Sequence, residues 1–336
     1  MTEKKNAKIY FRLLLLAFIL CAAFWLDING GYRRIQPDEL WEIFLGGGEK
    51  GLRYTLIHLR LPRVLISLLV GVGLAVSGCV MQGVSGNDMA EPGILGIHGG
   101  GGLFLAVFFV FFKGNGGNFS FLLPVIAFCG CACIAALDYS LARTEEGMSP
   151  RRFLLVGIAV ATAVSSITSM LMLRMSDSDY AFVQNWLSGN IWGAGWENVG
   201  MLFVGLLVLA GFCFYKSRTL NVLALGRQNA LGLGVPVARQ NLLFLAAAMG
   251  ISGLCCAVGG GLSFVGLVCP HLAKRITGPN FRYLLPGSML TGGILMLLSD
   301  LISRTLLSPK EISIGIVAAV IGAPYFVYLI IRGTPR

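Results

Sequence analysis

A cysteine and a histidine flank one proline in the stretch "GLSFVGLVCPHLAKR", which contains Cys269, Pro270 and His271 in succession. A thiolate and an imidazole are ligands that zinc and soft transition metals accept. However, these two side chains are only two positions apart, and no third soft ligand lies nearby in the sequence. Pro270 also disfavours continuation of a helix. We therefore predict no metal site here, and we interpret Pro270 and His271 as structural markers of the place where a helix ends.

The other cysteines carry the same potential for metal binding. The chain has nine cysteines, almost all within apolar runs, and Cys129, Cys131 and Cys133 fall in one run. Positions i, i+2 and i+4 of a helix do not share one face, so these three thiols cannot converge on one ion. We interpret the cysteines as small, polarizable packing residues. The sequence predicts neither a metal nor another cofactor.

The elements that must carry these residues are membrane spans. Of the 336 residues, 56% are hydrophobic and only 12% are charged, about half the charge of a soluble domain. A span needs about 20 mostly apolar residues, and the first apolar run is expected to be a retained helix rather than a cleaved signal. We predict an all-α integral membrane protein with about ten spans, the eighth too short to cross alone. They lie at residues 8–26, 61–82, 93–112, 119–137, 153–173, 196–215, 241–258, 260–270, 284–302 and 312–331.

The basic residues indicate the orientation of these spans. Most of the 26 lysines and arginines lie before the first span, after the last, or in alternate connections between them. Because cytoplasmic loops carry the excess of positive charge, we predict that both termini are cytoplasmic. The net charge of +10 therefore requires no nucleic-acid partner.

The chain reads as one transmembrane domain, residues 1–336, with no soluble module attached. Its longest outer polar stretch, residues 27–60, mixes charges with aromatic residues, and we expect it to lie at the level of the lipid headgroups. Glycine accounts for 45 residues and is concentrated within the spans. Small residues one helical turn apart allow close approach of helix backbones, so we expect a compact bundle.

The sequence gives little indication of an energy source within the chain. It has no G-x-x-x-x-G-K-[ST] phosphate loop, so ATP is not bound by that route. Carboxylates that couple ion flow usually lie within the membrane, whereas the acidic residues here cluster at span ends. Asp300 also has Arg304 one turn later as a partner. A self-contained secondary carrier or channel is therefore the weaker alternative.

Three separated stretches together resemble the FecCD family of ABC-importer permeases, which includes vitamin B12, haem and iron-siderophore importers. The first stretch, "LRLPRVLISLLVGVGLAVSGCVMQGVSGNDMAEPGILGI", is similar to R-x-P-R, G-x-x-x-Q and N-P-L-A-[DE]-P-x-x-L-G. The second, "ALGRQNALGLGV", is similar to A-L-G-x-x-x-A-x-x-L-G-V. The third begins "FVGLVCPHLAKR" and continues as "SDLISRTLLSPKEISIG", similar to F-V-G-L-x-x-P-H-x-x-R and D-x-x-x-R-x-x-x-x-P-x-E-x-P-x-G.

The resemblance implies the type II permease fold, with ten helices in each of two permease subunits in a bacterial cell membrane. It also implies two separate ATPase subunits, which hydrolyse the ATP, and an extracytoplasmic substrate-binding protein. The permease itself would then not be an enzyme. The expected function is import of an iron-siderophore into the cytoplasm by alternating access. A haem or cobalamin importer stays open as the alternative, as does the choice between a homodimer and a pair of homologous permeases.

The resemblance also implies roles for residues in the cytoplasmic segment at about 218–240. That segment matches the short helices by which the family engages its ATPases. The matching positions are Leu225, Gly226, Ala230, Leu233 and Gly234. Arg227 and Gln228 depart from the acidic residues that many members carry there, which alters the expected electrostatic pairing with the ATPase.

Two further sets of residues match functional positions of the family. Arg60, Arg63 and Arg304 match the arginines that meet glutamates of the binding protein, although arginines at helix ends also serve as membrane anchors. Asn87 and Met89 match an inner loop that narrows the translocation path. In that loop Asp88 replaces the usual proline and Met89 the usual leucine.

Overall fold

The computed structural model describes residues 2–30, 47, 49–112, 122–144, 147–191, 195–308 and 310–332. The fold is almost wholly helical, with one two-stranded antiparallel hairpin. The elements are α1 (Thr2–Asn29), α3 (Lys50–Tyr54), η1 (Thr55–Arg60), α4 (Leu61–Ser85), α5 (Ile97–Phe111), α6 (Leu122–Ala142), β1 (Arg143–Thr144), β2 (Gly147–Met148), α7 (Pro150–Met172), α8 (Asp177–Leu187), α9 (Trp196–Tyr215), α10 (Ser217–Leu223), α11 (Arg227–Gly232), α12 (Val237–Gly259), α13 (Val265–Thr277), α14 (Phe281–Thr305) and α15 (Ile314–Arg332).

Seven helices of the described chain are long and apolar enough to cross a membrane. They are α1, the continuous helix Lys50–Ser85, α6, α7, α9, α12 and α14. Two shorter apolar helices, α5 and α15, accompany them. The prediction of an all-helical membrane protein is therefore confirmed, and α13 is the short helix that takes the place of the eighth span.

The second span is longer than predicted. Residues 50–60 were expected to lie in an interfacial connector, but they are helical and continue directly into α4 through the π-helical turn η1. No glycine or proline interrupts the chain from Leu52 to Leu61, and the wider turn accommodates an extra residue without ending the helix. Residues 31–46 and 48 of the predicted connector lie outside the described residues.

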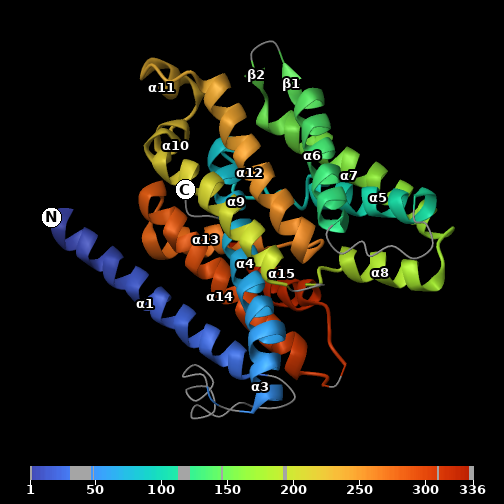
Figure 1. The fold of residues 1–336 in the computed structure, drawn as a ribbon. Helices are drawn as coiled ribbons and strands as arrows, with labels where there is room; N and C mark the ends of the chain where they lie inside the picture. Colours follow the sequence, from blue (N-terminus) through green and yellow to red (C-terminus); the bar gives the residue numbers. More distant parts are fainter. Residues whose placement is uncertain are drawn as a thin grey trace.

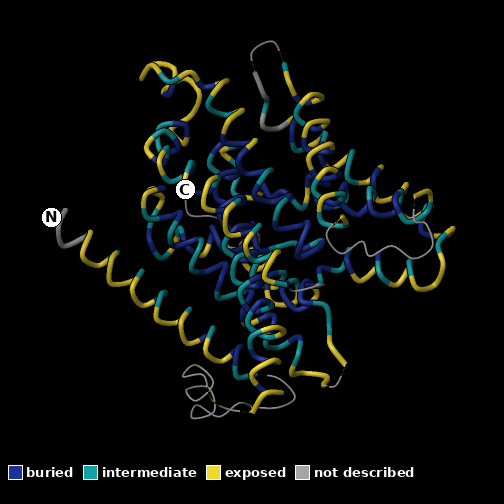
Figure 2. Tube along the Cα trace, viewed as in Figure 1, coloured by how far each residue is buried: buried dark blue, intermediate teal, exposed yellow. Residues whose placement is uncertain are grey.

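Helix α4 occupies the axis of the bundle (Figure 1). About 78% of its most apolar stretch is buried within the chain, against 6% for α1 and 17% for α7. It contacts α9, α12, α13 and α14 directly. The burial colours in Figure 2 show the same arrangement, with buried residues along the centre and exposed residues along α1. The outer helices therefore keep broad apolar surfaces for lipid or for another subunit.

Glycines allow α4 to approach its neighbours at backbone distance. A Cβ atom at Gly71 would clash with the carbonyl of Gly292 in α14, and one at Gly292 would clash with Gly71. At Gly78 a Cβ would clash with the backbone of Gly266 in α13. Helices pack this closely in membranes because small residues permit extensive van der Waals contact. The predicted compact bundle is therefore confirmed at these crossings.

The short eighth helix lies further along the chain than predicted. Residues 260–264 are non-helical, Phe264 has a left-handed backbone with φ of 72°, and α13 then runs from Val265 to Thr277 through Pro270. The prediction that the helix ends at Pro270 is wrong. A proline leaves the carbonyl four residues before it without a helical donor. Here the amide of Gln82 in α4 donates to that carbonyl, on Gly266, at 3.2 Å.

Different elements lie at the two ends of the bundle. The short helices α10 and α11 and the β1–β2 hairpin lie at one end, which we call the α10–α11 end (Figure 1). Helix α3 and the connection between α14 and α15 lie at the opposite end, which we call the α3 end. The predicted functional residues divide between these two ends.

Candidate functional site

The segment predicted to engage an ATPase forms a helical hairpin at the α10–α11 end. Two glycines allow its turns, because Gly226 has φ of 95° and Gly234 has φ of 77°. Ala230 is fully buried and anchors α11 to the bundle, whereas Leu225 is 59% and Leu233 is 64% exposed. The five matched residues therefore divide into two that shape the turns, one that packs, and two that present apolar surface.

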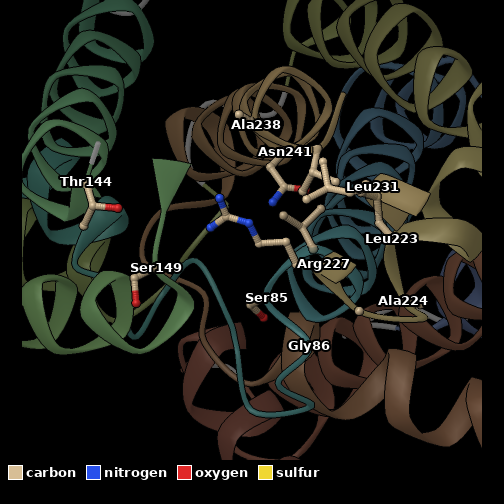
Figure 3. A pocket seen from close by; sticks show the side chains of 13 residues that line it. Ser85, Gly86, Thr144, Ser149, Leu223, Ala224, Arg227, Leu231, Ala238 and Asn241 are labelled. Carbon is tan, nitrogen blue, oxygen red and sulfur yellow. The ribbon is translucent and has the colours of Figure 1, made fainter. Parts of the chain in front are cut away.

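A cavity of about 440 Å³ lies behind this hairpin. It is bounded by α4, strand β1, α10, α11 and α12, and its lining includes Ser85, Thr144, Ser149 and Asn241. Figure 3 shows that the Arg227 side chain extends across this cavity from α11. Arg227, which departs from the family pattern, therefore lines this cavity with its side chain, although the residue as a whole is exposed.

The inner loop that follows α4 is held by local hydrogen bonds. The Asn87 side chain accepts from the backbone of Met89 at 2.9 Å, and Ala90 donates to the Asn87 carbonyl at 3.0 Å. The Met89 side chain is 48% exposed. Asn87 therefore shapes the loop, and Met89 presents its apolar side chain at the surface of this chain.

Two carboxylates connect the inner loop to α13. Lys274 donates to both carboxylate oxygens of Asp88 at 2.9 and 3.1 Å. The buried carboxylate of Glu91 accepts hydrogen bonds from the backbone of Phe264 and Gly266. A carboxylate at this position satisfies donors at the start of a helix that have no helical partner. The loop is therefore attached to both halves of α13.

His271 is buried in the bundle, with 7% of the residue exposed. Its ring lies 6.3 Å from the ring of Tyr325 in α15, in an edge-on arrangement. All nine cysteines, including Cys269, are free thiols. Among the described residues, no group of three or more His, Cys, Asp or Glu side chains is placed to hold a metal ion.

The three predicted docking arginines gather at the α3 end, and ion pairs within the chain hold Arg63 and Arg304 there. Arg63 donates from Nε to Asp300 at 3.0 Å and from Nη1 to Glu311 at 2.8 Å. Its side chain is only 16% exposed. Arg60 is half-buried and donates to the carbonyl of Ile28 at 3.3 Å.

Arg304 is the more deeply buried member of this arginine cluster, with 8% of its side chain exposed. It forms an ion pair with Asp27 and donates to the carbonyl of Gly30 at 3.3 Å. Its Nε also lies 3.1 Å from the Asp300 carboxylate, which confirms the predicted pairing one turn apart. The pairings of Arg63 were missed, because sequence separations above 200 residues give no local signal.

Helix α7 presents hydroxyl groups along an outward face, a feature that sequence patterning had not singled out. Thr162, Ser165, Ser166 and Ser169 are all exposed within this span. Thr162, Ser166 and Ser169 donate to carbonyls one turn earlier at about 2.9 Å. Their oxygens still have acceptor capacity, so this face is more polar than a purely lipid-facing surface.

Solved structures place this bundle in a known class. An inward-facing structure of a metal-chelate type ABC transporter matches with a TM-score of 0.83 and 27% identity, covering 96% of this chain and 99% of that chain. The fold is that of the type II permeases of ABC importers. The protein is thus a multi-pass membrane protein of the transporter class.

Sequence comparison gives the family within this class. The chain matches the FecCD transport family over residues 15–332 and belongs to it. It is 39% identical to the iron(3+)-hydroxamate import system permease protein FhuG of Bacillus subtilis (strain 168), with 94% of each chain covered. It is 36% identical to the Fe(3+)-citrate import system permease protein YfmE of the same bacterium, covering 98% of this chain and 97% of that protein.

Proposed function

We propose that this chain is the permease subunit of an ATP-driven importer that moves a ferric chelate into the cytoplasm. The observation that carries the proposal is its end-to-end similarity to permeases for ferric hydroxamate and ferric citrate. The protein makes and breaks no bond in the cargo, and ATP is hydrolysed by separate subunits. Residues 1–336 act as one transmembrane domain.

Two ATPase subunits dock at the α10–α11 end, which faces the cytoplasm together with both termini. The support is the exposure of Leu225, Leu231 and Leu233 on a short loop at the end of the bundle. Exposed apolar side chains grouped in this way mark protein interaction sites. Short helices with a buried anchor at Ala230 suit the transmission of rigid-body movement.

A second permease subunit, identical or homologous, completes the translocation path. The hydroxyl-bearing face of α7 supports its placement along that path, because a chelate rich in oxygen atoms needs polar contacts as it crosses the membrane. Asn87 and Met89 contribute to the inner gate: Asn87 shapes the loop and the exposed Met89 side chain narrows the exit. Asp88 holds that gate loop against α13.

A substrate-binding protein docks at the α3 end through the arginine cluster. Arginine remains charged and binds carboxylates with two parallel hydrogen bonds. Arg60 is half-buried and is the proposed contact for the binding protein, whereas Arg63 and Arg304 are held in ion pairs within the chain and position the docking surface. Arg60→Glu is therefore a cleaner test than a double reversal with Arg63, which would also break the internal ion pairs.

The test of the proposed function begins with a tagged chain purified from its native membranes together with the subunits that remain bound. The complex is reconstituted into liposomes, and ATP-dependent uptake of 55Fe is measured with hydroxamate and with citrate as chelators. Haem and cobalamin serve as competing cargoes. We expect uptake of a ferric chelate that stops when the ATPase subunits carry an inactivating substitution. Uptake that continues at the same rate without ATP hydrolysis would show that the proposal is wrong.

The docking assignment is tested in the same system. Arg60→Glu is expected to weaken the affinity of the binding protein for the complex in the liposomes. Arg53→Glu serves as the control, because Arg53 is exposed and lies about two helical turns before Arg60. An unchanged affinity for Arg60→Glu would remove Arg60 from the docking surface.

A further inference from the structure

A hydrogen-bonded joint connects α10 to the beginning of α14. The Asn221 side chain of α10 accepts from the backbone N–H of Phe281 at 2.9 Å. The same side chain donates to the Asn280 side chain at 3.1 Å, and Asn280 accepts from the backbone N–H of Arg282 at 3.0 Å. Two asparagines, 59 positions apart in the sequence, therefore cap one helix together.

This joint differs from an ordinary helix cap. The first N–H groups of a helix have no helical partner, and a side chain just before the helix usually satisfies one of them. In α14, Asn280 fills that usual position, whereas Asn221 comes from a separate short helix. Movement of α10 must therefore either carry the start of α14 with it or break the cap.

The start of α14 lies directly against the elements that shape the inner loop. A Cβ atom at Gly83, in the last turns of α4, would lie only 2.5 Å from the Phe281 ring. A cavity of about 290 Å³ is bounded by Asp88 of the inner loop, Ala224 between α10 and α11, Lys274 of α13 and Phe281 of α14. Four elements that must move together in an importer thus surround one small space.

The ion pair of Lys274 with Asp88 completes the connection from this turn to the inner loop. Lys274 lies in the last turn of α13, close in sequence to the turn that leads into α14. A shift of the α13–α14 turn therefore moves Lys274, to which Asp88 is paired. The contacts run from α10 through Asn221 and the α13–α14 turn to the inner loop.

We propose that Asn221 is the positioning residue that transmits movement of α10 to the α13–α14 turn, and through it to the inner loop. This inference rests on the proposed function, since it assigns the route by which ATPase movement reaches the gate. Asn221 contacts neither cargo nor nucleotide. It acts through the helix start that it caps.

The test uses the purified complex in liposomes, with three variants and two rates. Chelate uptake and ATP hydrolysis are measured for Asn221→Ala, Asn221→Asp and the control Ser140→Ala. The exposed Ser140 hydroxyl donates within its own helix, α6, to the carbonyl of Leu137 at 2.8 Å, so its removal tests loss of a polar side chain outside the α10–α11 hairpin. Thermal unfolding of each variant is recorded in parallel.

We expect Asn221→Ala to lower the amount of chelate moved per ATP by about fivefold, the factor that corresponds to one lost helix cap, while hydrolysis continues. Asn221→Asp keeps an acceptor for the Phe281 N–H and should restore part of that ratio. Ser140→Ala should leave the ratio unchanged. If all three variants keep the wild-type ratio, or if uptake and hydrolysis fall in proportion, Asn221 has no transmitting role. Failure of the proposed function is distinct, because the wild-type complex would then show no ATP-dependent uptake.

Discussion

At the scale of single residues, Asp300 stands out because it serves two arginines at once. Its carboxylate is fully buried and lies between Arg63 and Arg304, while Asp27 supplies a second buried carboxylate. Buried charges cost desolvation energy that only close partners offset. The arginine cluster is therefore preassembled inside the chain, and its positive charges do not wait for a partner to become ordered.

Substitution at Asp300 should test this arrangement. Asp300→Asn leaves two buried guanidinium groups short of a counter-charge, so we expect a loss of about 3–5 kcal/mol in unfolding free energy. Glu311→Gln, at a side chain that is 48% exposed, should cost no more than about 1 kcal/mol. Thermal unfolding in detergent compares the two variants. Equal losses would contradict the central role of Asp300.

Gln82 illustrates a residue whose role the sequence could not reveal. Its amide donates to the carbonyls of Gly266 and Leu267 at 3.2 and 3.3 Å. Gln82→Leu should destabilise the chain by about 1–3 kcal/mol, because a buried carbonyl loses its donor. The matched variant Gln82→Met also removes the donor while keeping the length of the side chain, and it should do no better. Retention of wild-type thermal stability by either variant would show that water or another group satisfies these carbonyls.

At the scale of elements, α13 shows where sequence patterning succeeds and where it fails. The short apolar segment and its glycines were recognised, but Pro270 was interpreted as the end of the helix. A proline stops a helix only when no other group can satisfy the freed carbonyl, and the donor here comes from α4. The start of α13 is likewise set by Glu91, far from it in the sequence. The continuation of α13 through Pro270 and its start at Val265 both depend on tertiary contacts, which a local sequence pattern does not contain.

The crossing of α4 and α13 gives the prediction at this scale. Gly78→Ala places a methyl group against the backbone of Gly266, so the helices must separate and the folded yield should fall sharply. Gly211→Ala is the control, since a Cβ there meets no atom within 4 Å and alanine favours helix by about 1 kcal/mol. Yield of monodisperse protein after membrane extraction measures both. A normal yield for Gly78→Ala would mean that the crossing is looser than described.

At the scale of the whole molecule, composition and the positions of apolar runs predicted the helical membrane fold, and the family motifs predicted its class. The residues that match the family's ATPase-engaging positions lie in and beside two short helices, α10 and α11. The central position of α4 was not predictable, because apolar periodicity does not show which span other spans surround. The polar face of α7 was missed for a related reason: serine and threonine are common in spans and become informative only once burial is known.

The exposed leucines of α11 and the turn after it yield a prediction for the assembled importer. Leu231 and Leu233 are 52% and 64% exposed, so aspartate at both positions should leave the bundle folded. We expect the double variant to purify without ATPase subunits, because charge replaces the apolar surface that they bury. Ser140→Asp, at an exposed position near the end of α6, is the control. Full retention of the ATPases by the double variant would place their docking surface elsewhere.

The central position of α4 has a genetic consequence. Because a buried helix fills the axis of the chain, the proposed route for cargo runs along an outer face that is shared with a second permease. Every working transporter then needs an unblocked α7 face on each of its two permeases. A cell that makes both an intact chain and one folded but blocked at the α7 face should fill many of its transporters with mixed pairs. If the permeases pair as identical copies, the blocked allele is therefore expected to be dominant over the intact one.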